Sequence, residues 1–265
     1  DSRRREAERE LQLSREAAAR DAGELDAARR IQMGLLPDPA SIFADEKRFS
    51  IAALLEPARA VGGDYYDCFM LDEQRLCVAI GDVSGKGVPA SLFMAISKTL
   101  TGTLMRRQAD PGLALRDIEC ELNRENSEYL FVTAFVGVLN LVSGEFKYVC
   151  AGHDAPILLR DGQVSRIDTT ATAGPPLCAL ADYPYRSGHQ QLDVGDVLCL
   201  FTDGVSEASD GHQMFGSERL AAALLAASPQ ASVMARAEAI RDAVRQFEAG
   251  RSPFDDLTVL LACWY

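Results

Sequence analysis

AIGDVSGKG, residues 79–87, is an apolar run that ends in Asp82 and passes into a glycine-rich turn. A β-strand that ends in this way delivers its carboxylate to the rim of a sheet, where glycine allows another backbone to approach closely. The same arrangement occurs in VGGDYYD (61–67), LFTDGVSE (200–207) and SPFDDLTVLL (252–261). Each fragment alone is first a turn signal, because Asp and Gly favour turns. Four of them together indicate acids gathered at one rim.

The acids of these segments form the candidate site. They are Asp64, Asp82, Asp203 and Asp255, with Asp67 and Asp256 beside them. Several carboxylates at one rim repel one another unless cations lie between them. Ligand sets made only of oxygen atoms select hard ions such as Mg²⁺ or Mn²⁺. The pattern therefore predicts a site for divalent cations.

Composition restricts the class of protein. The chain has 265 residues, of which 48% are hydrophobic and 25% charged, as in globular proteins that fold around a core. A formal net charge of -12 argues against nucleic acid or an anionic membrane as partner. The sequence contains no apolar stretch of the ~20 residues that span a bilayer, and no signal peptide is recognisable.

The cysteines indicate a reducing compartment. There are seven, an odd number, and no two form a CxxC pair. Most lie in apolar runs, such as Cys77 in RLCVAI and Cys199 in VLCLF. We therefore expect buried, reduced thiols in a cytoplasmic protein, and neither a disulfide framework nor a zinc site.

Two regions differ in texture. Residues 1–36 are rich in Ala, Glu, Arg and Leu and predict a helix. An incomplete heptad pattern of apolar residues includes Leu11, Ala18 and Leu25. It leaves two options open: a coiled coil that forms a homodimer, or a solvated linker helix. Residues 37–265 are expected to form one folded domain. The chain begins without Met, so we expect a piece of a longer protein. An upstream sensor or receiver domain is one candidate for the remainder.

Beyond the first helix, short β-rich runs alternate with paired helices. Turn dipeptides at 143–144 and 161–162 predict two hairpins. The predicted helices span residues 88–107, 113–129, 218–227 and 231–247. Mostly antiparallel strands with helices inserted in pairs predict an α+β layered fold.

Seven motifs in a fixed order carry a resemblance to a known family. They are ARRIQMGLLP, PARAVGGDYYD, GDVSGKGVPASLFMA, FVTAFVGVL, AGHDAPILLR, LFTDGVSEA and DDLTVL. Over about residues 27–265 the chain resembles the metal-dependent protein phosphatases of the protein phosphatase 2C type. It is most similar to the bacterial branch of the stage II sporulation phosphatase and the phosphatases that activate stress sigma factors. The resemblance implies an α-β-β-α sandwich of two antiparallel sheets flanked by helices.

The resemblance also implies a site and a mechanism. Two divalent cations, Mn²⁺ or Mg²⁺, would be held between Asp64 and Asp82, with the Val83 backbone carbonyl as a further ligand. Asp203 and Asp255 would complete the second ion. A water held between the ions would attack phosphorus in line, so that no protein nucleophile is required.

Several assignments stay open. Either Asp255 or Asp256 is the ligand in DDLT, and alignment with the family pattern favours Asp255. Asp67 is a second candidate near the site, although a turn carboxylate is the simpler interpretation. Arg59 is either a phosphate-binding arginine, as in animal members of the family, or a surface residue. Ser84 stands where those enzymes have a histidine proposed as general acid.

Two further residues have structural interpretations. His153 in AGHDAP is typical of the family and is expected to be a hydrogen-bonding residue of the fold. Lys86 in SGKG suggests a phosphate-binding loop, but neither Ser nor Thr follows it, so the GxxxxGK[ST] pattern is absent.

By family resemblance, the substrate is a phosphoserine or phosphothreonine of an anti-anti-sigma (STAS-domain) protein. Two alternatives compete with a phosphatase. One is an inactive module of the same fold that binds a phosphoprotein. The other is a nucleotide cyclase, because VGGDYYD contains a GGD turn, although Tyr65 and Tyr66 break the cyclase pattern. The resemblance also suggests that helices 88–107 and 113–129 form a movable element on which the N-terminal helix acts.

Overall fold

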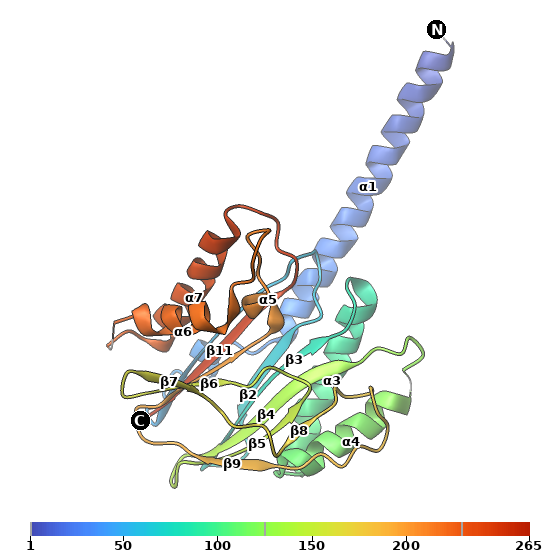
Figure 1. Cartoon of the computed structure of the whole chain (residues 1–265). Coiled ribbons are helices and arrows are strands. Elements are labelled where there is room, and N and C mark those ends of the chain that lie inside the picture. The colour runs from blue at the N-terminus through green and yellow to red at the C-terminus, as the bar shows by residue number, and fades with distance from the viewer. Residues whose placement is uncertain (1, 125, 229) are drawn as a thin grey trace.

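Two β-sheets packed face to face form the centre of the molecule, with helices on both outer faces (Figure 1). This computed structural model describes residues 2–124, 126–228 and 230–265. All neighbouring strands of the first sheet are antiparallel. Its order is β1 (Phe49–Glu56), β11 (Leu257–Trp264), β10 (Val197–Phe201), β6 (Ile157–Arg160) and β7 (Gln163–Arg166).

The second sheet is antiparallel except for one short parallel pair between β5 and β8. Its order is β2 (Tyr65–Met70), β3 (Arg75–Val83), β4 (Val132–Asn140), β5 (Glu145–Ala151) and β8 (Ala173–Gly174), and β9 (Gly188–Gln191) also pairs with β5. The predicted hairpins are confirmed, because β4 pairs with β5 and β6 pairs with β7.

Helices cover each sheet from outside. The second sheet is contacted by α3 (Val88–Arg107) and α4 (Pro111–Arg124), and the first by α6 (Gly216–Ala226) and α7 (Val233–Glu248). Short helices lie at α2 (Pro39–Ile42) and α5 (Asp203–Ser206). In the described residues, no helix has the length and apolar character needed to cross a bilayer.

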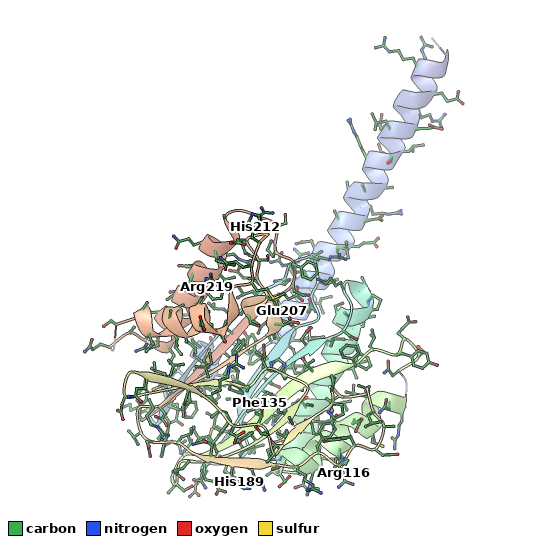
Figure 2. The ribbon with its side chains drawn as sticks, viewed as in Figure 1. Arg116, Phe135, His189, Glu207, His212 and Arg219 are labelled. Atoms are coloured by element: carbon green, nitrogen blue, oxygen red, sulfur yellow. The ribbon has the colours of Figure 1, made fainter. Side chains whose placement is uncertain are left out.

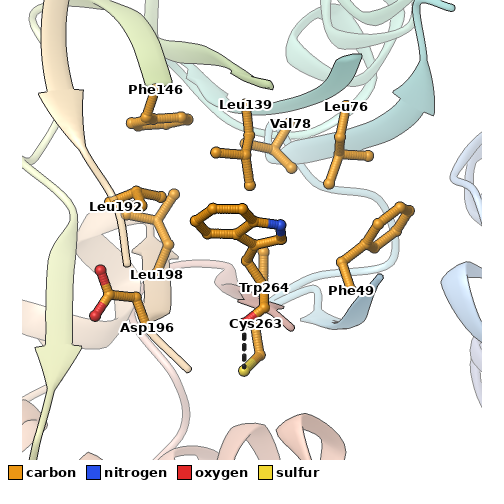
Figure 3. A pocket seen from close by; sticks show the side chains of 11 residues that line it. Phe49, Leu76, Val78, Leu139, Phe146, Leu192, Asp196, Leu198, Cys263 and Trp264 are labelled. Atoms are coloured by element: carbon orange, nitrogen blue, oxygen red, sulfur yellow. Dashed lines mark hydrogen bonds between the residues drawn. The ribbon is translucent and has the colours of Figure 1, made fainter. Parts of the chain in front are cut away.

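The central strands are apolar along their whole length because both of their faces are buried. Every residue of β11 is buried, because α7 lies on one of its faces and the second sheet on the other. Figure 3 shows the indole of Trp264 pointing toward Leu139 and Val78 of the second sheet. Its Nε1 donates to the carbonyl oxygen of Leu141, 3.3 Å away. In the second sheet, the ring of Phe135 (Figure 2) stacks on those of Phe146 and Tyr148.

The N-terminal helix α1 (Ser2–Leu35) projects away from the sandwich (Figure 1). Its described side chains before Leu25 are exposed, whereas Leu25 is half-buried. Gln32, near the end of α1, and Leu36, just after it, are buried in the domain. The helix therefore has a free N-terminal part and a docked C-terminal part.

The predicted α+β fold is confirmed, with one helix end corrected. The prediction of a helix to residue 129 is wrong, because α4 ends at Arg124. Asn126 forms a turn instead: its side chain accepts from the Leu130 amide and donates to the Leu130 carbonyl. Side-chain bonds of this kind compete with helix formation.

Candidate metal centre

Strand order brings the four acidic segments to one end of the sandwich. Asp64 precedes β2 and Asp82 lies near the end of β3, and these two strands are antiparallel neighbours. Asp203 follows β10 and Asp255 precedes β11, which are also antiparallel neighbours. In an antiparallel pair, the start of one strand lies beside the end of the other. Each sheet therefore contributes two acids to the same rim.

Asp64 is buried and joins the two sheets. Its Oδ2 accepts hydrogen bonds from the hydroxyls of Thr202, at 2.7 Å, and Thr258, at 2.5 Å. The Thr202 hydroxyl in turn accepts from the Thr258 amide at 3.2 Å, so both side chains are fixed. Burial, reinforced by the charges of Asp82 and Asp256, raises the pKa of Asp64 well above its ordinary value.

The pKa values of Asp82 and Asp203 are also raised by burial and by neighbouring carboxylates. Burial raises the pKa of Asp82 to about 7, with further contributions from the charges of Asp203 and Asp255. Burial and the charges of Asp255, Glu207 and Asp154 raise the pKa of Asp203 to about 6. Figure 2 shows Glu207 beside α5. The four predicted acids thus influence one another, and each ionised carboxylate makes the next harder to ionise.

A close approach of two backbones completes the rim. The carbonyl of Gly63 accepts from the Val83 amide at 3.3 Å. A Cβ on Gly63 would stand 2.7 Å from the Val83 carbonyl oxygen and 3.3 Å from Asp82 Oδ1. Only glycine fits there, so the VGGD turn can lie directly against the Val83 carbonyl, which the family resemblance implies as a ligand.

The two aspartates of DDLT make different contacts. Asp256 is buried, and its two oxygens accept from the amides of Ala58 and Gly63, each at 2.7 Å. It therefore holds the loop that leads to Asp64. Asp255 is partly exposed, and its Oδ2 lies 2.9 Å from Lys86 Nζ. This difference supports Asp255 as the candidate ligand and Asp256 as a positioning residue.

Asp67 and Arg59 lie outside these contacts. Asp67 lies within strand β2 and not in the expected turn, and its ion pair with Lys98 of α3, at 3.2 Å, ties the sheet to the helix. Arg59 is exposed and forms no ion pair or hydrogen bond with any residue that the structure describes. Its side chain is therefore available to a ligand from solvent.

His153 connects the two sheets. Nδ1 lies 2.9 Å from the Thr133 hydroxyl on β4, and Nε2 lies 3.0 Å from the carbonyl oxygen of Phe201 on β10. A carbonyl only accepts, so Nε2 carries the proton and Nδ1 accepts from Thr133. Burial lowers the pKa of His153 to about 4, which keeps the ring neutral. These contacts agree with the structural interpretation of this residue.

Ser84 and Gln32 fix two turns of the rim. Ser84 Oγ accepts from the Phe131 amide at 2.9 Å, which attaches the GDVSG turn to the segment before β4. Gln32 of α1 donates to the Gly62 carbonyl at 2.7 Å and accepts from the Gly62 amide at 3.1 Å. The N-terminal helix is thus bonded directly to the turn that carries Asp64.

Sequence reasoning missed Thr202, Thr258 and Gln32. Both threonines are present in LFTDG and DDLT, but their shared role requires the pairing of β10 with β11. Gln32 lies 30 positions from Gly62, and no periodicity links the two. All three residues stand inside the family motifs, Gln32 in ARRIQMGLLP, but no motif shows which backbone or side chain each of them contacts.

The donor set fits divalent cations in chemistry. It is made only of oxygen atoms, and the raised pKa values of Asp82 and Asp203 report a concentration of negative charge that a cation would relieve. In the part of the chain that the structure describes, however, no three His, Cys, Asp or Glu residues are already arranged as a formed metal cage. Instead, Asp64 accepts hydrogen bonds from two hydroxyl groups, and Asp255 forms an ion pair with Lys86.

Comparison with known proteins places this chain. The family model described as stage II sporulation protein E matches residues 72–265. Protein IcfG of Synechocystis sp. is 30% identical, over 89% of this chain and 41% of IcfG. Phosphoserine phosphatase RsbU of Bacillus subtilis is 31% identical, over 69% of this chain and 53% of RsbU. The chain thus spans about half or less of the length of these curated relatives.

A solved structure confirms the fold. The SiaA-PP2C domain of Pseudomonas aeruginosa superposes with a TM-score of 0.79, covering 94% of this chain and 98% of that domain, at 22% identity. The order of motifs, the double-sheet architecture and the matched family model agree. The chain belongs to the stage II sporulation protein E family and has the protein phosphatase 2C-type fold.

Proposed function

We propose that this chain hydrolyses phosphoserine or phosphothreonine on a regulatory partner protein. The observation that carries the proposal is the meeting of four aspartates from two sheets, with raised pKa values at Asp64, Asp82 and Asp203. Asp64, Asp82, Asp203, Asp255 and the Val83 carbonyl would hold two divalent cations, Mn²⁺ or Mg²⁺. When bound, these ions would supply an activated water and neutralise charge on the phosphoryl oxygens.

The chain's own residues prepare this chemistry. Thr202 and Thr258 orient Asp64, and Asp256 holds the loop before it. The exposed guanidinium of Arg59 is the candidate group that binds the substrate phosphate, since its fork matches phosphate oxygens. Both ring nitrogens of His153 are engaged in hydrogen bonds, so this residue has a structural role and no nucleophilic one in the proposed reaction.

The substrate class rests on relatives. RsbU of Bacillus subtilis is named a phosphoserine phosphatase. By this likeness we propose a phosphorylated anti-anti-sigma (STAS-domain) protein as substrate, and control of a sigma factor as outcome. The seven cysteines are all free, which supports a cytoplasmic location.

Regulation would use the N-terminal helix. Gln32 connects α1 to the turn before Asp64, and α3 leaves directly from the GDVSGKG turn after Asp82. An upstream signal that moves α1, through pairing with a second copy or otherwise, would therefore act on both turns of the site. The pair α3 and α4 is the proposed movable element.

The test is release of inorganic phosphate from a phosphoserine-containing STAS-domain protein, and from p-nitrophenyl phosphate, in Mn²⁺. We expect hydrolysis of both, and loss of most turnover in Asp203→Asn with an unchanged circular dichroism spectrum. Wild-type turnover in Asp203→Asn at saturating Mn²⁺ would contradict the assignment.

The two alternatives give different results in the same assay. An inactive phosphoprotein-binding module would retain the phosphorylated partner in a pull-down but release no phosphate from either substrate. A nucleotide cyclase would consume nucleoside triphosphate and leave p-nitrophenyl phosphate intact. Neither alternative predicts Mn²⁺-dependent hydrolysis.

A further inference from the structure

Lys86 is the one residue of the GDVSGKG turn whose charge the proposed reaction does not use, and it lies on a candidate ligand. Its Nζ is 2.9 Å from Asp255 Oδ2 and donates to the carbonyl oxygen of Phe254 at 2.6 Å. The same ammonium lies 4.1 Å from the centroid of the Phe254 ring. A carboxylate, a carbonyl and an aromatic face thus surround one cation.

This contact occupies one of the two carboxylate oxygens with which Asp255 would bind a metal ion. Asp255 Oδ1 already accepts from the Asp256 amide at 3.0 Å. Oδ2 is the remaining oxygen, and Lys86 takes it. An ion that binds Asp255 through Oδ2 must therefore share that atom with an ammonium group or displace it.

We propose that Lys86 is an internal cation that competes with the second divalent ion for Asp255. The inference rests on the proposed metal site and adds a residue that sets its affinity. Lys86 and Asp82 lie four residues apart on one turn, so the turn that supplies a ligand also supplies the competitor. Lys86 also lies two residues before α3, so displacement of α3 would move this cation toward or away from Asp255.

In the opposite role, Lys86 would hold Asp255 in the geometry that a metal ion needs. Removal of Lys86 would then weaken Mn²⁺ binding, whereas competition predicts that its removal strengthens binding. An ammonium beside a divalent ion repels it, and the pair is only partly buried, with side-chain exposures of 28% and 31%. Ion pairs exposed to this degree add little rigidity, whereas the charge repulsion persists at short range. We therefore expect the repulsion between Lys86 and the metal ion to exceed the benefit of holding Asp255 in place.

The first experiment measures Mn²⁺ affinity directly, without substrate. Metal-free protein with residues 1–265 is titrated with MnCl₂, and free Mn²⁺ is followed by electron paramagnetic resonance. We expect Lys86→Met to lower the dissociation constant of the weaker ion roughly tenfold, and Lys86→Arg, which keeps the charge, to stay within about twofold of wild type. Unchanged or weaker Mn²⁺ binding in Lys86→Met would overturn the proposal.

Lys147→Met is the matched control. Lys147 of β5 forms an ion pair with Asp110, the residue before α4, and the two side chains have exposures of 33% and 26%. The Lys147→Met variant loses the same charge as Lys86→Met, from an ion pair of similar solvent exposure. An equal gain of affinity in Lys147→Met would show a general charge effect and would also overturn the proposal.

The second experiment needs no variant. Wild-type protein is treated briefly with a limiting acetylating reagent, and modification of each lysine is measured by mass spectrometry with and without Mn²⁺. We expect Mn²⁺ to increase acetylation of Lys86 relative to Lys98 and Lys147. If Mn²⁺ binds and Lys86 reactivity is unchanged or reduced, this inference fails alone; if the wild-type protein binds no Mn²⁺, this inference and the proposed function fail together.

Discussion

At the scale of single residues, the rim stores repulsion that cations would relieve. Asp82 is the clearest case, because its pKa stands at about 7 instead of 3.8. A carboxyl group whose pKa is raised on folding destabilises the folded state once it ionises. The penalty is absent at low pH, grows as pH rises from about 4 through 7, and is complete above that range.

We therefore expect Asp82→Asn to raise the melting temperature of the metal-free protein while it removes most turnover. Each kcal/mol of relieved repulsion corresponds to about 2–4 °C for a domain of this size. The difference from wild type should grow between pH 5 and pH 8. Thermal unfolding in EDTA across this range checks it, and a melting temperature below wild type at pH 8 would contradict it. Added Mn²⁺ should stabilise wild type more than the variant.

The neighbouring aspartates of DDLT offer an isosteric comparison. Asp256→Asn turns an NH₂ group toward either the Ala58 or the Gly63 amide, both of which now donate to the carboxylate. Loss of one charge-assisted hydrogen bond in a buried site costs about 1.5–3 kcal/mol, so the melting temperature should fall by roughly 3–12 °C.

Asp255→Asn should leave the melting temperature within about 2 °C of wild type, because its side chain is partly exposed and an exposed ion pair contributes little. It should nevertheless lose most turnover. Calorimetry and phosphate release on both variants decide the matter. The reverse pattern, with Asp255→Asn the less stable and Asp256→Asn the less active protein, would exchange the two roles.

At the scale of elements, the docked end of α1 and the VGGD turn act as one unit. Gln32→Ala removes a donor and an acceptor from Gly62, next to the turn that carries Asp64. We expect Mn²⁺ affinity to fall severalfold. Gln12→Ala is the matched control, because Gln12 lies on the exposed part of α1 and, among the side chains that the structure describes, bonds to Glu16. Mn²⁺ titration of both variants checks this prediction. Equal affinities would show that Gln32 does not contribute to the metal site.

Most elements followed from local pattern. The bounds of α3, the two hairpins and the apolar run of β11 were visible because turn dipeptides and unbroken hydrophobic runs are local signals. The end of α4 was not, because the side chain of Asn126 redirects the chain. The acids of the site were visible as motifs, whereas the contacts that orient them join strands of different sheets. Those contacts depend on register, which no single motif contains.

At the scale of the whole molecule, the described side chains of α1 before Leu25 are exposed to solvent. A helix that packs on nothing gains no tertiary stabilisation, and Leu11 and Leu13 remain exposed on it. If a second copy covers this helix, deletion of residues 1–26 should halve the molar mass measured by light scattering and change the Mn²⁺ dependence of turnover. If both stay unchanged, the segment is a passive tether and the regulatory proposal fails.

The central claim is that four aspartates from two sheets act through bound divalent cations. The most direct measurement follows phosphate release from a phosphoserine protein while the metal content of the same sample is determined by elemental analysis. The account predicts no turnover after chelation and dialysis, and recovery with Mn²⁺ or Mg²⁺ in wild type but not in Asp203→Asn. Full turnover in excess EDTA, with no residual metal in the protein, would contradict it.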